Sequence, residues 1–315
     1  MFWDIFNQAL TPLLIMFTCL AIGFLCKKLN VLPDNTSTVL SKLATYVIIP
    51  AVVLNANMRN FTVEYFLSNW NIFLYSLLAL AVAFGLAYAI APLFKLQDEY
   101  KKKVYTYALT FANFGYMGTP LAQMLLGSGY INYVIFTFFM GVMTNSWGVI
   151  VLTPKEYRSG GLLKSLLNVP TISLFVSILL GLTGIGNLFP DFVVSTVAKI
   201  DACYGPVAMI LTGFLIGGYK LSNMLTDVRV YIATFLRLIV LPAIIVGVMY
   251  LAKANQVILV CTLFAYACPL GLNTVVFPAA FGGDPKTGAG MAIISHTLCV
   301  LTIPAMYALL SVLVL

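Results

Sequence analysis

The sequence predicts an all-α membrane protein with ten transmembrane helices arranged as a 5+5 inverted repeat. Three observations predict this fold: a very apolar composition, ten apolar segments of membrane-spanning length, and similar residues at a nearly constant offset in the two halves. Of the 315 residues, 61% are hydrophobic and 9% are charged, whereas a soluble domain has roughly 25% charged residues. Together with the mean hydropathy of +1.00, this composition indicates a protein that lies in a bilayer.

Ten segments are apolar over the length of about 20 residues that a helix needs to cross the hydrocarbon core. They are numbered here as spans 1 to 10 and cover residues 5–26, 36–58, 67–94, 103–126, 130–152, 169–188, 193–219, 230–251, 255–281 and 288–313. The N-terminal residues carry neither a basic patch nor a small-residue cleavage site, so we expect no removable signal peptide and count the first segment as a span.

Basic residues are concentrated in alternate loops. The loops after spans 1, 3, 5, 7 and 9 hold twelve Lys and Arg residues, whereas the opposite loops hold only Arg59 and Lys253. Because cytoplasmic loops carry the excess of Lys and Arg, we expect both termini to be extracytoplasmic, in a multi-pass protein of the cell membrane. Residues 153–168 are then a cytoplasmic linker. The net charge of +7 follows from this topology, and no nucleic-acid partner is expected.

The two halves on either side of this linker resemble each other. The tripeptide Ser-Thr-Val occurs at residues 37–39 and again 158 residues later, and three prolines have counterparts at offsets of 156 to 158 residues (Pro12 and Pro170, Pro50 and Pro206, Pro120 and Pro278). Each match alone is weak, but four at nearly one offset favour a duplication. Since five spans is an odd number, the second repeat (169–315) enters the membrane from the side opposite to the first (1–152), as in many secondary transporters.

Two spans contain residues that disfavour a helix interior at corresponding depths. Span 4 contains "NFGYMGTP" at residues 113–120, and span 9 contains "ACPLGLNTVVFP" at residues 267–278. Unwound backbone at membrane depth is tolerated only where it is buried in protein or lines a cavity. Either break alone is also compatible with a simple kink between packed helices, but the pair of breaks predicts one shared site.

The half-helices that follow the breaks predict the chemistry of this site. We expect them to begin at Thr119–Pro120, with Thr119 as the N-cap, and near Asn273–Thr274. Helix N-termini present free N–H groups and a partial positive charge, which suit an anion, and Asn113 and Asn273 add amide donors for a carboxylate. The candidate substrate-binding residues are Asn113, Gly115, Thr119, Pro120, Pro269, Gly271, Asn273 and Thr274.

These motifs resemble the auxin efflux carrier family. The resemblance is carried by "NFGYMGTPL" in span 4 and "ACPLGLNTVVFPAAFGGDPKTGAG" in and after span 9, and it extends to "LSKLATYVIIPAVVL", "GPVAMILTGFLIGG" and "RLIVLPAII". It implies a fold similar to sodium/proton antiporters, in which spans 1, 2, 6 and 7 form a scaffold. Spans 3–5 and 8–10 would form a transport domain with crossing broken helices and an elevator-like motion. The resemblance also implies a homodimer through the scaffold. The long hydrophilic central loop of many plant members is absent here.

Other intramembrane polar residues are candidates for coupling or for supporting the site. His296, the only histidine, could titrate near neutral pH and couple transport to protons, while Arg237 lies roughly 12 Å into span 8 and Asn145 lies inside span 5. The commoner roles are a packed neutral histidine, a structural pairing of the arginine, and a helix–helix hydrogen bond of the asparagine. Lys42 is expected to snorkel toward the membrane surface. No Asp or Glu lies beside the breaks, which disfavours a cation site built from paired acids.

We therefore expect a secondary transporter of small organic anions, such as malate, malonate or auxin-like acids, and no enzyme activity. The single histidine and the absence of H-E-x-x-H and G-x-S-x-G motifs disfavour catalysis. The scattered cysteines disfavour a metal site, and no cofactor is expected. An anion channel and an intramembrane carboxylate sensor with the same midplane site remain open, as do the identity of the carboxylate and a coupling proton or sodium ion.

Overall fold

Helices make up all the regular secondary structure that the structure describes. The structure is a computed structural model that describes residues 1–154, 169–219, 226–280 and 284–314. The expected linker therefore lies almost entirely outside the described residues, and so do four of the twelve basic residues expected on the cytoplasmic side (Lys155, Arg158, Lys164 and Lys220). Within the described ranges there is no strand, and the one β-type pairing is an isolated antiparallel bridge between Ala112 and Leu270.

Short helical elements follow one another closely in the first half of the chain, because several of the expected spans contain π-helical or 3₁₀ turns (labelled η). The elements are α1 (Phe2–Lys28), α2 (Thr36–Leu43), η1 (Ala44–Ile48), α3 (Ile49–Asn57), α4 (Val63–Asn69), α5 (Asn71–Ile90), η2 (Ala91–Phe94), α6 (Glu99–Thr110), η3 (Phe114–Gly118), α7 (Thr119–Leu126), η4 (Gly127–Gly129), α8 (Tyr130–Phe136), α9 (Phe138–Met143), η5 (Thr144–Gly148) and α10 (Val149–Leu152).

The second half is built in the same way and ends in one long helix. Its described elements are α12 (Val169–Thr183), η7 (Ile185–Leu188), α13 (Asp191–Ala202), α14 (Tyr204–Gly217), α15 (Val228–Phe235), η9 (Leu236–Val240), α16 (Leu241–Leu251), α17 (Gln256–Tyr266), α18 (Asn273–Ala280) and α19 (Lys286–Leu313).

Six of the ten expected spans form helices that are long and apolar enough to cross a membrane. They are Phe2–Lys28, Thr36–Asn57, Asn71–Phe94, Asp191–Gly217, Val228–Leu251 and Lys286–Leu313, and a seventh exists if Phe114–Phe136 and Phe138–Leu152, which meet at 47°, are taken as one. The segments expected as spans 4, 5, 6 and 9 are interrupted or shorter among the described residues. The chain is thus a helical membrane protein with several apolar spans.

Non-helical backbone interrupts the helices at two places. Residues 111–113, here called the first break, separate α6 from η3, and residues 267–272, the second break, separate α17 from α18. The bridge between Ala112 and Leu270 joins the two breaks, so segments that are far apart in the sequence lie side by side. Each break therefore supplies hydrogen-bonding partners for the other in a place where lipid supplies none.

Three of the π-helical turns have a proline as their cause. Pro50, Pro120 and Pro242 each follow the last residue of a π-helical turn by two positions, in η1, η3 and η9 respectively. A proline inside a helix removes one N–H donor and its ring clashes with the carbonyl of residue i−4. A wider turn accommodates that clash without breaking the helix. The sequence thus distributes local widenings along the spans by the placement of its prolines.

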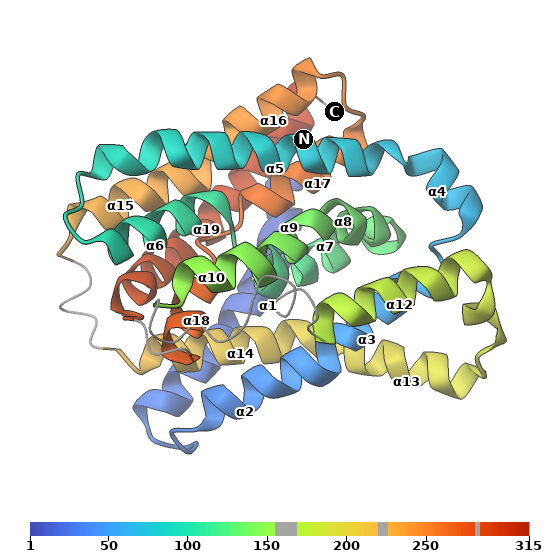
Figure 1. Ribbon diagram of the computed structural model, residues 1–315, viewed down its shortest axis with the longest axis horizontal. Coiled ribbons are helices and arrows are strands. Elements are labelled where there is room, and N and C mark those ends of the chain that lie inside the picture. The colour runs from blue at the N-terminus through green and yellow to red at the C-terminus, as the bar shows by residue number, and fades with distance from the viewer. Residues whose placement is uncertain (155–168, 220–225, 281–283, 315) are drawn as a thin grey trace.

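The helices gather into two groups (Figure 1). Helices α2, α3, α12, α13 and α14 lie along one side of the molecule, and α5, α15 and α16 lie along the other; α1 packs on α14 of the first group. Glycines permit very close backbone contacts in the first group. A Cβ on Gly213 would lie 1.8 Å from the carbonyl oxygen of Leu20, and one on Gly186 would lie 1.7 Å from that of Met58.

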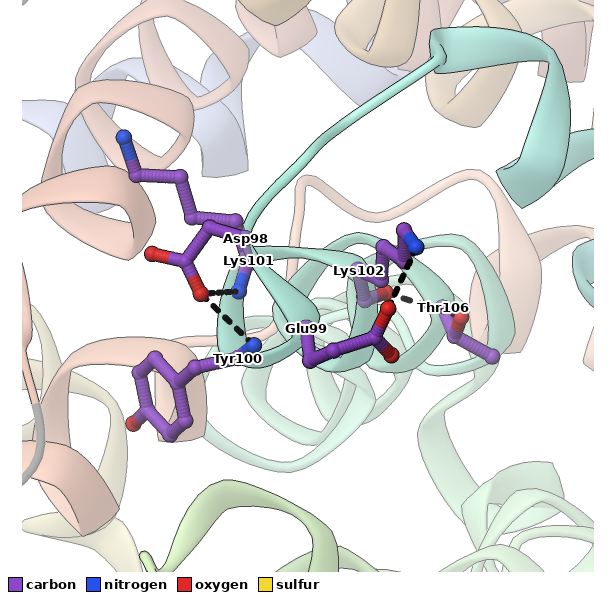
Figure 2. A network of polar contacts seen from close by, with 6 residues as sticks. All are labelled: Asp98, Glu99, Tyr100, Lys101, Lys102 and Thr106. Atoms are coloured by element: carbon purple, nitrogen blue, oxygen red, sulfur yellow. Dashed lines mark hydrogen bonds and ion pairs between the residues drawn. The ribbon is translucent and has the colours of Figure 1, made fainter.

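The first broken span has a sharply defined start at α6. Asp98 precedes the helix with extended backbone, and its carboxylate Oδ1 accepts hydrogen bonds from the amides of Tyr100 at 2.7 Å and Lys101 at 3.3 Å (Figure 2). Within the first turns, the hydroxyl of Thr106 donates to the carbonyl of Lys102 at 2.9 Å. An acidic N-cap satisfies the free amides and the dipole of the helix, so α6 begins at a fixed point before it runs toward the first break.

Candidate functional site

The two breaks are held together by backbone hydrogen bonds. The amide of Asn113 donates to the carbonyl of Pro269 at 2.7 Å, and the amide of Gly271 donates to the carbonyl of Phe111 at 3.3 Å. An unpaired buried amide or carbonyl costs about 1–3 kcal/mol, so each of these two hydrogen bonds offsets part of the cost of unwinding the helices. It brings the residues predicted for one shared site together.

The half-helix after the first break begins earlier than the sequence predicts. It starts at Phe114 with the π-helical turn η3 rather than at Thr119–Pro120, and Asn113 occupies the N-cap position. Asn113 also receives the first backbone bonds of this helix, since its carbonyl accepts from the amides of Met117 at 3.1 Å and Gly118 at 3.0 Å. The prediction that Thr119 is an N-cap was wrong.

Thr119 and Pro120 instead lie inside a continuous helix. The hydroxyl of Thr119 points back to the carbonyl of Phe114 at 3.4 Å, within the widened turn that Pro120 produces. The amides of Gly115 and Tyr116 precede the first backbone hydrogen bond of η3, so they belong to the positive end of the half-helix.

The half-helix after the second break begins at Asn273, as the sequence predicts. Its first side chains are engaged within the protein: the amide nitrogen of Asn273 donates to the hydroxyl of Tyr107 at 3.1 Å, and the hydroxyl of Thr274 donates to the carbonyl of Gly271 at 2.8 Å. Thr274 is completely buried. This threonine therefore stabilises the turn before α18 and does not face open space.

A cavity of about 510 Å³ lies against both breaks. Five of the eight predicted substrate-binding residues line it, namely Asn113, Gly115, Thr119, Gly271 and Asn273. The other three lie behind its wall, namely Pro120, Pro269 and Thr274. Further wall comes from α2, η1 and α3, from α8 and α9, from α12, and from Tyr204 of α14, so the cavity lies between the breaks and the first group of helices.

The charge of the cavity wall is positive. Among its described residues only Lys42 carries a formal charge, and no Asp or Glu contributes. The positive ends of two half-helices meet the same space, because Gly115 and Tyr116 of η3 and Leu272 and Asn273 at the start of α18 line it. Lys42 is exposed at the surface of the protein yet lines the cavity. The expectation that it only snorkels was therefore incomplete.

Two tyrosines on the wall were missed by the sequence analysis. Tyr116 of η3 and Tyr204 at the start of α14 both line the cavity, with their ring centroids 6.2 Å apart. A Cβ on Gly115 would lie 3.5 Å from the hydroxyl of Tyr204, so this phenol reaches the first turn of η3. Tyr116 lies within the quoted motif, and only its position between two glycines could have marked it.

His296 joins the site from α19 without lining the cavity. Its Nε2 lies 3.0 Å from the amide nitrogen of Asn113, and its Nδ1 lies 2.7 Å from the carbonyl oxygen of Ala292. The ring is 1% exposed. The preceding residue, Ser295, accepts a hydrogen bond from the amide of Leu270 at 3.2 Å. Adjacent residues of α19 thus contact the first and the second break.

Arg237 does not line the cavity and contacts the two helices that precede the breaks. Its guanidinium is fully buried, donates to the carbonyl of Leu109 at 3.0 Å, and lies over the ring of Tyr266 at 5.7 Å. Leu109 is near the end of α6 and Tyr266 is the last residue of α17, so the cation lies at the carbonyl end of α6, where a positive charge is favourable, and against the ring of the last residue of α17. This geometry fits a structural role.

Asn145 and a buried acid complete the polar residues near the site. The backbone of Asn145 lies in η5, whereas its side chain is outside the described part of the structure. Asp201 of α13 is 5% exposed, and its carboxylate accepts hydrogen bonds from the amides of Asn55 at 2.6 Å and Gln123 at 2.8 Å. It does not line the cavity.

Comparison with known proteins gives the family. A family model described as membrane transport protein matches residues 8–161 and 160–307, which together cover nearly all of the chain. No curated protein matches the sequence. The two matched segments meet at residues 160–161, and the first contains the first break while the second contains the second break. The chain belongs to the auxin efflux carrier family of membrane transport proteins.

Proposed function

We propose that this transporter is a secondary carrier of small organic anions and that it binds a carboxylate in the cavity beside the two breaks. The observation that supports this most directly is the wall itself: two half-helix N-termini converge there, and its only formally charged residue among those described is Lys42. Helix N-termini and a lysine favour an anion, and about 510 Å³ lies within the range of small-molecule sites.

The predicted residues have different proposed roles. Asn113, Gly115, Thr119, Gly271 and Asn273 would contact the substrate, since they line the cavity. Pro120, Pro269 and Thr274 do not line the cavity, and they would set the backbone conformation at the starts of the half-helices. The tyrosine rings on the cavity wall would contact the apolar or aromatic part of a substrate. Malonate, malate and indole-acetate, which differ in that part, are therefore all reasonable probes.

The finer architecture is also part of the proposal. We propose ten spans in a 5+5 inverted repeat (1–152 and 169–315), with crossing broken helices, extracytoplasmic termini and a position in the cell membrane. Spans 1, 2, 6 and 7 would form the scaffold and the contact of a homodimer, while spans 3–5 and 8–10 move as an elevator. The position of the cavity between the first group of helices and the breaks supports such a motion, because sliding along that boundary would carry the site across the membrane.

Binding and flux measurements test this function. Purified protein should be stabilised in thermal unfolding by at least one carboxylate probe, and the amide analogue of that probe should bind much more weakly because it lacks the charge. In liposomes, uptake of the labelled probe should saturate and should accelerate when unlabelled probe is present on the other side. Saturable binding without any flux would favour a sensor, and flux without trans-acceleration would favour an anion channel.

Labelling tests the topology. Single cysteines are placed at Ser159 and Asn223, which lie outside the described residues, in a background without the six native cysteines. Both should react with a membrane-impermeant reagent only from the cytoplasmic side. A cysteine at Leu188 of η7 is the matched control and should react only from outside. Reaction of either of the first two positions from outside would contradict the proposed orientation.

A further inference from the structure

The hydrogen bonds of His296 define its protonation state in this conformation. The carbonyl of Ala292 can only accept, so Nδ1 must carry a hydrogen and donate to it at 2.7 Å. The amide nitrogen of Asn113 is a donor, so Nε2 must present its lone pair to it at 3.0 Å. Together the two contacts specify a neutral imidazole with its hydrogen on Nδ1.

This arrangement also fixes the orientation of the Asn113 amide. Its NH₂ group is turned to the histidine, so its oxygen is the atom left for other partners. Asn113 lines the cavity. A carboxylate that enters the cavity would therefore meet an acceptor oxygen on Asn113, next to the one N–H of the amide that the histidine does not use.

A proton on Nε2 would reverse this orientation. The imidazolium has two donors and no acceptor, so the NH₂ group of Asn113 could no longer face it. Rotation of the amide by half a turn would place the oxygen against the new N–H and turn both N–H donors of the amide away from the ring, toward the cavity. Hydrogen bonds that involve a charged partner are roughly twice as strong as neutral ones.

We propose that His296 is the proton-binding site of the carrier and that Asn113 transmits its protonation to the anion by the orientation of its amide. This inference rests on the proposed anion site. One proton binds to Nε2 of the imidazole as one carboxylate binds in the cavity, so the two charges compensate each other, and both leave together on the other side. Because binding is reciprocal, the anion favours the proton by the same factor as the proton favours the anion.

No other ionisable group has the contacts needed to take over this role. Several elements pack against α19. One of them, η9, contains Arg237, whose guanidinium is bonded to Leu109 and lies over Tyr266 of α17. α17 also brings Cys261, α6 brings Tyr107 bonded to Asn273, and α14 brings Tyr204 on the cavity wall. α1 and α15 carry Lys27, Lys28, Cys19, Cys26, Asp4, Arg229 and Tyr231, and α19 itself carries Lys286, Cys299 and Tyr307. Among the described residues, only Asn113 and Ala292 are hydrogen-bonded to the ring of His296.

The asparagine that follows the second break lacks such a switch. The amide nitrogen of Asn273 donates to the phenol of Tyr107, and a phenol keeps its hydrogen up to a pH of about 10. Its amide orientation is therefore independent of pH in the physiological range. The geometry assigns proton coupling to one of the two breaks.

The experiment measures proton uptake and affinity together. Wild-type protein in lightly buffered detergent solution, with malonate and indole-acetate as probes, should take up about one proton per bound anion, as followed by a pH-sensitive dye. The dissociation constant should rise up to about tenfold per pH unit on the alkaline side. His296→Gln should keep binding and lose both effects. Ser295→Ala, which removes the contact to the second break from the adjacent residue, is the matched control and should keep both.

The outcomes separate the two proposals. Binding of a probe to wild-type protein without proton uptake would contradict the role of His296 and leave the anion site standing, and so would unchanged pH dependence in His296→Gln. If that variant does not fold, the proton count on wild-type protein decides. Failure of both probes to bind would contradict the proposed anion site as well.

Discussion

The two breaks have the same backbone plan and different chemistry. Both are short non-helical segments, each ends near an asparagine, and each supplies backbone hydrogen-bond partners to the other. Yet Asn113 is 3% exposed and donates to an imidazole, whereas Asn273 is only partly buried and donates to a phenol. The two breaks thus bring two helix N-termini to one cavity, and the side chains that contact the two asparagines differ in whether they can titrate near neutral pH.

A second difference lies in the helices that follow. The first break leads into a π-helical turn, whose wide backbone results from Pro120 two residues beyond it, while the second leads directly into α18. Away from the cavity wall, a single residue contacts the helices before both breaks, because Arg237 donates to a carbonyl near the end of α6 and lies over the ring of the last residue of α17. The two breaks therefore differ in the helices that follow them, which line the cavity where substrate and proton are proposed to bind.

The largest effect is expected where the breaks share a partner. Arg237→Ala removes the donor to Leu109 and leaves a large cavity, so the loss of stability should be about 3–5 kcal/mol, the cost of emptying a large buried site. The control Arg229→Ala removes an exposed arginine and should change stability by less than about 0.5 kcal/mol. Thermal unfolding of both variants in detergent measures this difference. Similar melting temperatures would mean that Arg237 does not anchor the breaks.

The next effect concerns the two asparagines. A hydrogen bond to a charged group contributes about 1.5–3 kcal/mol, so Asn113→Ala and Asn273→Ala should each weaken carboxylate binding roughly 10- to 150-fold. Only Asn113→Ala should also lose the dependence of affinity on pH, because it removes the link to His296. Dissociation constants at several pH values, measured beside the melting temperatures, test both statements. Unchanged affinity in both variants would place the anion site elsewhere.

These asparagines also illustrate what the sequence can predict. Helix-breaking residues at corresponding depths were enough to predict two breaks, their meeting and a cavity beside them. The pairing of Asn113 with His296 was not predictable, since α19 is separated from the first break by most of the second half and nothing in its periodicity marks one face. The start of the half-helix at Phe114 was also missed, because a proline was taken to begin a helix, whereas here it widens a helix that has already begun.

A smaller effect is expected at the glycines that adjoin the breaks. A Cβ on Gly288 of α19 would lie 2.2 Å from the backbone carbonyl oxygen of Thr274, whereas one on Gly115 would meet nothing closer than the Tyr204 hydroxyl at 3.5 Å. Overpacking a core costs typically about 1–3 kcal/mol, so Gly288→Ala should lower the melting temperature clearly and Gly115→Ala only slightly. An equal loss in both would mean that the first break is as tightly packed as the second.

The smallest effect should separate the two threonines. Thr274 is fully buried and its hydroxyl donates to Gly271 at 2.8 Å, whereas the bond from Thr119 to Phe114 is long, at 3.4 Å. Replacement by valine keeps the shape of the side chain and removes the donor, so Thr274→Val should cost about 1 kcal/mol of stability, the net value of an ordinary hydrogen bond. Thr119→Val should cost less than half of that, because a stretched bond contributes less. Thermal unfolding of the two variants under one set of conditions makes the comparison direct. A larger loss in Thr119→Val would mean that this threonine is a helix cap after all, and that the half-helix of the first break begins where the sequence alone predicts.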